Sequence, residues 1–163
     1  MTRQNLGDET TTMTAEGDEL LMERVFDAPR EAVWAAMTTP EHIPHWWGPR
    51  GSTTEVVEMD VRPGGRWRWI NKFETGEAPY KGEYLEVVPP ERLVRTSLFD
   101  VGPEGPPAIE TISLEDLGGG KTRLRHHARF PSEDVLAFAI SQGMAKGVLE
   151  QLDRLAELAA TLA

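Results

Sequence analysis

The sequence predicts an α+β fold in which an antiparallel sheet of six to seven strands is curved around one long C-terminal helix. Short segments rich in strand-forming residues follow one another, each bounded by Gly or Pro. Their connections, such as Arg62-Pro63-Gly64-Gly65, are too short for the crossover that parallel strands need. Apolar residues then recur at helical spacing after Ser132. Because a sheet must cover its apolar face, this helix is expected to lie across it.

Length and composition favour one acidic domain. The 163 residues are enough for a core without disulfides, and the absence of Cys excludes disulfides, thiolate metal sites and a cysteine nucleophile. A cytoplasmic location is therefore expected. The net charge of −10 disfavours binding to nucleic acid or to a membrane surface. Residues 1–17 are mostly polar and predict a disordered or loosely attached tail, and residues 18–163 predict a single domain.

The elements are expected in the order strand, two short helices, six strands and the long helix. The first strand is expected near 20–26, and Pro29 suits the first turn of the helix that follows. A second short helix is expected from Pro40 and should end near Pro44. The long helix begins at Ser132. The six remaining strands are predicted at 53–61, 66–73, 81–88, 92–99, 109–116 and 122–130.

Four phrases carry a resemblance to a known family. They are Trp46-Trp47-Gly48-Pro49, Asp60-Val61-Arg62-Pro63-Gly64-Gly65, Pro89-Pro90-Glu91-Arg92-Leu93-Val94 and Gly119-Gly120-Lys121-Thr122-Arg123-Leu124. From about residue 20 to 162 the sequence resembles the START-like (SRPBCC) superfamily. Within it, the chain is similar to the branch named after the C-terminal domain of the activator of the heat-shock chaperone ATPase. The resemblance implies a helix-grip fold with a cavity between the sheet and the long helix. Members bind lipids, sterols, polyketides and other apolar molecules, and a minority are cyclases or hydrolases.

One departure from that family affects the expected cavity. The family commonly places an aromatic residue after the helix glycine, where this chain has Val148 after Gly147. The smaller side chain should leave extra room at this position.

Tryptophans supply the first candidates for a ligand wall. Trp67 and Trp69 lie two apart on a predicted strand and therefore share a face, where they either fill the core or line a pocket. Trp46 and Trp47 lie where a helix gives way to a loop and form either a plug over one end of the core or a lid over a pocket mouth. Tyr84, Met144 and Val148 would complete the wall.

His126 is the candidate polar group inside the cavity. It shares a strand face with Leu124, Ala128 and Phe130, all of which are apolar. It is either a histidine satisfied by a protein partner or an anchor for a ligand, and it is also the weak candidate for a general base. The carboxylates of Glu83, Glu86 and Glu110 could pair as acid and base, but alternating carboxylates on strands usually face solvent, and that is what we expect here.

Gly143 and Gly147 lie four apart and would share one face of the long helix. Each costs about 1 kcal/mol relative to Ala in a helix interior, so a compensating reason is expected. Either a ligand presses against the helix backbone there, or the glycines admit Trp67 or Trp69.

The sequence supports three hypotheses of function. The first is a binding domain for an apolar or aromatic small molecule, and the second is a cyclase, dehydratase or hydrolase that uses His126. The third, a chaperone-modulating module, is disfavoured because the activator's partner-binding N-terminal domain has no counterpart here. No cofactor is expected. No metal is expected either, because Pro44 interrupts the pair His42 and His45. A homodimer is left open, since two-fold dimers are the commonest oligomers.

Overall fold

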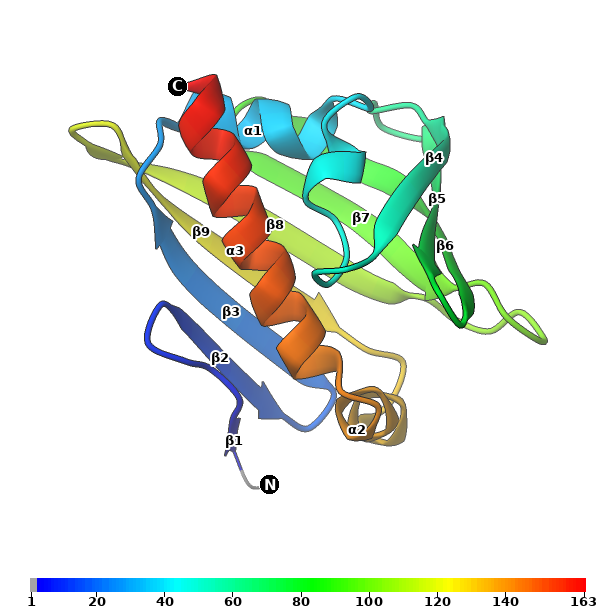
Figure 1. Ribbon diagram of the computed structural model, residues 1–163. Helices are drawn as coiled ribbons and strands as arrows, with labels where there is room; N and C mark the ends of the chain where they lie inside the picture. The colour runs from blue at the N-terminus through cyan, green and yellow to red at the C-terminus, as the bar shows by residue number, and fades with distance from the viewer. Residues whose placement is uncertain (1–2) are drawn as a thin grey trace.

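The computed structural model describes residues 3–163, which form one curved antiparallel sheet with helices across its inner face (Figure 1). Within these residues the sheet has nine strands in the order β1-β2-β3-β9-β8-β7-β6-β5-β4. The predicted α+β class and helix-grip arrangement are confirmed, with two strands more than expected. The strands are β1 (Gln4–Asn5), β2 (Thr11–Glu16), β3 (Glu19–Phe26), β4 (Thr53–Met59), β5 (Arg66–Phe73), β6 (Gly76–Val88), β7 (Arg92–Phe99), β8 (Ala108–Gly118) and β9 (Lys121–Arg129).

The two additional strands come from the segment expected to be a tail. β2 pairs with β3, with Met13 opposite Met22, and the side chain of Met13 is fully buried. Residues Thr11, Met13 and Ala15 alternate toward the core, so pairing with β3 compensates for the weak apolar character of this segment. The expectation of a tail is therefore wrong for residues 3–17, while residues 1–2 lie outside the described residues.

The segment between β3 and β4 contains the two expected helical pieces. α1 (Arg30–Thr38) begins after Pro29, which stands at its N-cap. The second piece is shorter and later than expected, because it is a single 3₁₀ turn, η1 (Ile43–His45), that contains Pro44. Proline is tolerated there because the first turn of a helix needs no amide hydrogen bond.

The C-terminal segment forms two helices where the sequence predicted one. α2 (Glu133–Ser141) begins at Ser132, whose hydroxyl accepts a hydrogen bond of 3.2 Å from the amide of Val135. α3 (Met144–Leu162) follows after Gly143, which has a φ of +86°. This left-handed conformation ends a helix and favours glycine, so Gly143 separates the two helices and does not lie on the face of either.

α3 packs across the sheet and against α1 (Figure 1). Its last turns are closely packed, because Leu152, Leu155 and Ala159 are at most 4% exposed. Its first turns pack more loosely, since Met144 and Val148 are only partly buried against the core. No helix in residues 3–163 combines the length and the apolar character needed to cross a bilayer.

Candidate functional site

The inner face of the sheet carries a wall of large aromatic side chains. Trp67, Trp69 and Tyr84 are at most 1% exposed, and the two indole rings lie 4.5 Å apart between centroids. Trp67 donates a hydrogen bond of 3.1 Å from Nε1 to the carbonyl of Thr96. Gly82 makes room for this indole, since a Cβ atom there would lie 2.5 Å from Trp67 Nε1. The glycine that admits a tryptophan is therefore Gly82.

A row of polar side chains crosses four neighbouring strands on the same face. Tyr84 lies opposite Arg95, and Arg95 lies opposite Glu110, so register alone brings these three together. Arg95 donates from Nε to Glu110 Oε1 over 2.8 Å. His126 lies diagonally across from Glu110, with 3.2 Å between Nε2 and Oε2. We call Tyr84, Arg95, Glu110 and His126 the polar ladder.

The polar ladder is mostly withdrawn from water but not sealed. The side chain of Arg95 is 6% exposed, while those of Glu110 and His126 are 17% and 14% exposed. All of them lie on the face that the helices cover. The Glu110 and His126 end of the row therefore keeps some contact with solvent.

Charge interactions decide the ionisation of the pair at the centre. Burial raises the pKa of the Glu110 carboxyl, but Arg95 and His126 more than compensate and hold that pKa well below its usual value. Burial lowers the pKa of Arg95, and the Glu110 carboxylate reverses that effect and raises it. Burial raises the pKa of the Tyr84 hydroxyl, against the opposing influence of Arg95. At neutral pH the ladder therefore holds an ionised pair beside a neutral phenol.

Arg95 also joins the ladder to the aromatic wall. Its guanidinium carbon lies 5.1 Å from the ring centroid of Trp67 and 5.2 Å from that of Trp69. A guanidinium within about 6 Å of an indole face is attracted by the ring, most strongly where water is excluded. The indoles therefore help to hold a cation that would otherwise be costly to bury.

The aromatic wall continues outward through Trp47. Its ring packs edge-on against Trp69, with 5.2 Å between centroids, and edge-on against Tyr80, with 5.1 Å. Tyr80 in turn packs against Phe99, which is 52% exposed. Trp47 itself is half-buried. It therefore lies between the buried indoles and the outer surface.

Trp46 has a different environment from its neighbour. It is 3% exposed and donates from Nε1 to the carbonyl of Ala36 over 2.7 Å. This places Trp46 between α1 and the core, as a plug. The loop that follows is fastened to α3, because Gln151 accepts a hydrogen bond from the Gly48 amide and Arg154 donates to the Gly48 carbonyl.

Gly147 lies beside this loop rather than beside the indoles. A Cβ atom added to it would meet Pro49 at 3.9 Å, and within residues 3–163 no other atom would lie within 4 Å. The expectation that Gly143 and Gly147 share a face that admits Trp67 or Trp69 is therefore wrong. Gly147 lies in open space on α3, between the partly buried Met144 and Val148.

Two of the four ladder residues escaped the sequence-based prediction. Glu110 was expected to face solvent, but it shares a strand face with Ala108, Ile112 and Leu114, which are buried. Arg95 likewise follows the buried Leu93 at a spacing of two. The signal available in the sequence was a spacing of two from apolar residues of the same strand, such as Leu93 for Arg95 and Ile112 for Glu110. The same spacing identified His126 on β9.

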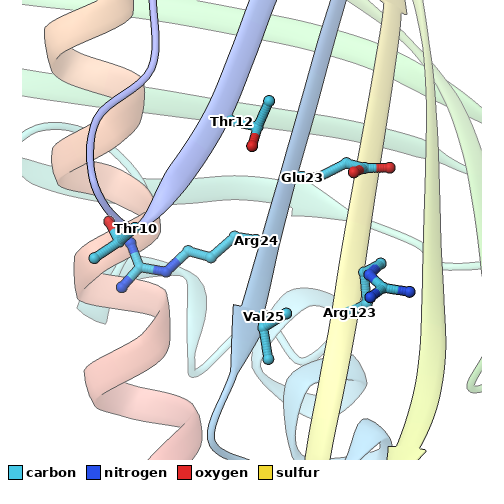
Figure 2. Close-up of a pocket in the computed structure, with 6 residues that line it drawn as sticks. All are labelled: Thr10, Thr12, Glu23, Arg24, Val25 and Arg123. Atoms are coloured by element: carbon cyan, nitrogen blue, oxygen red, sulfur yellow. The ribbon is translucent and has the colours of Figure 1, made fainter.

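Two surface hollows stand out in residues 3–163, and neither is lined by a predicted ligand residue. The larger one, of about 320 Å³, opens where β2 begins beside β3 and β9 (Figure 2). The smaller one, of about 150 Å³, lies between α2 and the strands β1 and β2. The larger is lined by Thr10, Thr12, Glu23, Arg24, Val25 and Arg123. Its arginines are already paired, because Arg24 contacts Asp153 and Arg123 contacts Glu115.

Metal ligands do not gather anywhere in the described part of the chain. Among residues 3–163 there is no group of three or more His, Asp or Glu side chains that could hold an ion. His45 lies in the 3₁₀ turn η1, and His42 precedes it.

Comparison with known proteins agrees with this architecture. A protein from Chromobacterium violaceum is 31% identical, with a TM-score of 0.73, and the match covers 86% of this chain and 96% of that one. A protein from Rhodobacter sphaeroides, 24% identical, shares the fold with a TM-score of 0.81 over 94% of this chain and 99% of its own. The AHSA1 protein from Silicibacter pomeroyi is 22% identical, with a TM-score of 0.72 over 89% and 99%.

A comparison with curated proteins finds no match. A family model does match, over residues 27–160, which include α1, η1, the strands β4 to β9, the whole polar ladder and nearly all of α3. The chain therefore belongs to the family described as Activator of Hsp90 ATPase homolog 1-like protein.

Proposed function

We propose that the protein binds an apolar or aromatic small molecule between the inner face of the sheet and the first turns of α3. The polar ladder would contact the polar end of the ligand. The observation that carries this proposal is the ionised pair of Arg95 and Glu110, which lies beside two buried indoles on the face that the helices cover.

The energetics of the pair favour a role beyond packing. Removing two charges from water is costly, and well-packed apolar residues are often at least as stabilising as a buried ion pair. Much of the surrounding inner face is apolar, with Leu93, Ile112 and Leu124 at most 2% exposed. The buried polar side chains of Asn71 and Thr122 on the same face are hydrogen-bonded within the protein. A few convergent polar groups in an otherwise apolar lining are typical of a small-molecule site.

The partial exposure of side chains in the polar ladder supports the same location for the ligand. Glu110 and His126 keep 17% and 14% of their side chains exposed although they face the helices. Met144 and Val148, in the first turns of α3, are only partly buried. We expect the short side chain of Val148 to leave room for a ligand, and Trp47 lies at the outer end of the wall.

A thermal-shift screen with native mass spectrometry tests the proposal. We expect at least one member of a panel of fatty acids, sterols and aromatic polyketides to raise the melting temperature and to appear as a bound mass. Val148→Trp should fill the space and abolish both signals. Ala160→Trp is the matched control, since Ala160 is exposed on the last turns of the same helix. The proposal fails if no compound binds, or if Val148→Trp binds as the unchanged protein does.

One observation favours catalysis at the same site as a second candidate function. Glu110 Oε2 lies 3.2 Å from His126 Nε2, so the carboxylate can orient the imidazole, and the other ring nitrogen is left to take a proton from a ligand. This arrangement suits a cyclase, dehydratase or hydrolase. Once a ligand is identified, its conversion by the unchanged protein and not by a folded His126→Ala variant would support an enzyme. Binding without any product would leave the binding function alone.

A further inference from the structure

Two buried donors, one beside the polar ladder and one in it, have no hydrogen-bond acceptor in the described part of the chain. They are the indole nitrogen Nε1 of Trp69 and the hydroxyl of Tyr84. Arg95 lies close to the Tyr84 oxygen and opposes the effect of burial, which raises the pKa of that hydroxyl. A guanidinium only donates, however, so the hydroxyl hydrogen still lacks an acceptor. Trp69 is fully buried and Tyr84 is 1% exposed. Most buried polar groups in proteins are hydrogen-bonded, and an unpaired one costs about 1–3 kcal/mol. Two such groups on one wall therefore call for a functional explanation.

Both groups can donate a hydrogen bond to a ligand, and both lie next to the guanidinium of Arg95. The indole nitrogen only donates, and the phenol donates as readily as it accepts. The Trp69 ring lies 5.2 Å from the guanidinium carbon of Arg95. Tyr84 lies directly opposite Arg95 in the pairing of β6 with β7. Both groups therefore lie near Arg95, and each could donate a hydrogen bond to an oxygen atom of a ligand.

The charge of the ladder indicates whether that oxygen is charged. Glu110 is ionised and lies 2.8 Å from Arg95, so the positive charge is already balanced. A carboxylate ligand would add a second negative charge to this desolvated row, where like charges repel strongly. A neutral acceptor carries no such penalty. A carbonyl oxygen therefore fits the site better than a carboxylate does.

We infer that the ligand of the proposed site is an apolar or aromatic molecule with a neutral carbonyl oxygen, which accepts hydrogen bonds from Trp69 Nε1 and the Tyr84 hydroxyl. This inference rests on the proposed binding function and names the class of ligand. The indoles of Trp67 and Trp69 face the apolar frame, and the two donors face its oxygen. Selection would come from the cost of leaving those donors unpaired when the carbonyl is missing.

Three small probes separate the oxygen from the frame that carries it. They are 2-acetonaphthone, which has the carbonyl, 2-isopropenylnaphthalene, in which a methylene group replaces the oxygen, and 2-naphthoate, which is anionic. Isothermal titration measures each of them against the unchanged protein and Tyr84→Phe. Tyr80→Phe is the matched control, because Tyr80 lies on the same strand and its hydroxyl is not among the unpaired groups.

We expect 2-acetonaphthone to bind about tenfold more tightly than 2-isopropenylnaphthalene, and more tightly than 2-naphthoate. Tyr84→Phe should reduce the carbonyl preference several-fold, and Tyr80→Phe should preserve it. The free Tyr84→Phe protein should lose little stability, because the substitution removes a buried hydroxyl whose hydrogen has no acceptor. This readout also shows whether the variant is folded.

Each other outcome has a definite meaning. If no probe binds, the inference fails, and the panel of fatty acids, sterols and polyketides then decides whether the proposed binding function stands. If the two neutral probes bind equally, the binding function stands and the carbonyl is not recognised. Tighter binding of 2-naphthoate would overturn the charge argument. A large loss of stability in free Tyr84→Phe with an unchanged preference would show that the hydroxyl is already satisfied in the free protein, and that also overturns the inference.

Discussion

The interior beneath α3 contains apolar side chains at one end and charged and polar side chains at the other. Under the last turns of the helix, Leu152, Leu155 and Ala159 pack with α1, and all are at most 4% exposed. At the other end, the sheet carries an ionised pair and two donors without an acceptor, and Met144 in the first turn of α3 is only partly buried. We call these the apolar end and the polar end.

The difference shows which end stabilises the fold. Apolar burial at the rate of about 25 cal/mol per Å² is available at the apolar end without any compensating cost. The polar end buries charges, and the cost of removing them from water offsets the gain from burying apolar surface there. Proteins depart from good packing chiefly at functional sites, so the polar end is where a function is to be sought.

The largest expected effect is at the centre of the polar end. Glu110→Ala leaves the Arg95 charge buried without its partner and should lower the free energy of unfolding by about 3–5 kcal/mol. Glu115→Ala is the control, because Glu115 pairs with Arg123 on the exposed side of the same strand and should cost little. Urea denaturation measures both. Equal, small losses would mean that the ladder is not a buried charge network.

A matched pair of truncations on α3 compares the packing of the two ends. Leu155→Ala at the apolar end should cost about 3 kcal/mol, within the usual range of 2–5 for such a change in a core. Met144→Ala should cost clearly less, because its side chain is only partly buried. Similar losses for the two variants, measured by the same denaturation, would contradict the loose packing of the first turns.

Acid should weaken the polar end in a defined pH window. The pKa of Glu110 is lowered in the folded state from an ordinary value of 4.5. Its contribution to stability is therefore complete above about pH 4.5 and is lost as the pH falls toward the folded-state pKa. Between pH 6 and roughly pH 3, the unchanged protein should lose stability more steeply than Glu110→Gln. If the stability of both proteins falls equally with pH, folding does not stabilise the ionised form of the Glu110 carboxyl.

The smallest expected effect is at Gly147. An added Cβ there meets only Pro49 at 3.9 Å, and alanine is favoured over glycine in a helix by about 1 kcal/mol. Gly147→Ala should therefore stabilise the free protein by roughly 0.5–1 kcal/mol. A melting temperature of Gly147→Ala above that of the unchanged protein, measured by calorimetry, would support this expectation. A loss of stability would indicate a close contact at the first turns of α3 and would weaken the contrast with the apolar end.

Local patterns in the sequence were sufficient for most of the fold. Gly and Pro punctuation located the strands from 53 onward, and β5 and β7 have the predicted bounds of 66–73 and 92–99. The β2 strand was missed because its inward positions include Thr11 and Ala15, which carry little apolar signal until β3 pairs with them. The break at Gly143 was missed because the apolar spacing continues past it.

The inward direction of candidate side chains was predicted only where the pattern of a single strand determines the face. Trp67, Trp69 and His126 were located by alternation along one strand. Arg95 and Glu110 were not, because a charged residue in a strand usually faces solvent. Their burial depends on pairing across β6, β7 and β8, and the register of several strands is not encoded in any local pattern.

Methionine methyl groups allow one direct measurement of both ends. Met22 lies opposite His126 and Met37 lies in α1, and each is 3% exposed, while Met144 begins α3. In ¹³C-methyl NMR during titration with 2-acetonaphthone, the resonances of Met22 and Met144 should shift and that of Met37 should not. Shifts at Met37 as large as those at Met22, or no shift at Met22 and Met144, would contradict a ligand site at the polar end.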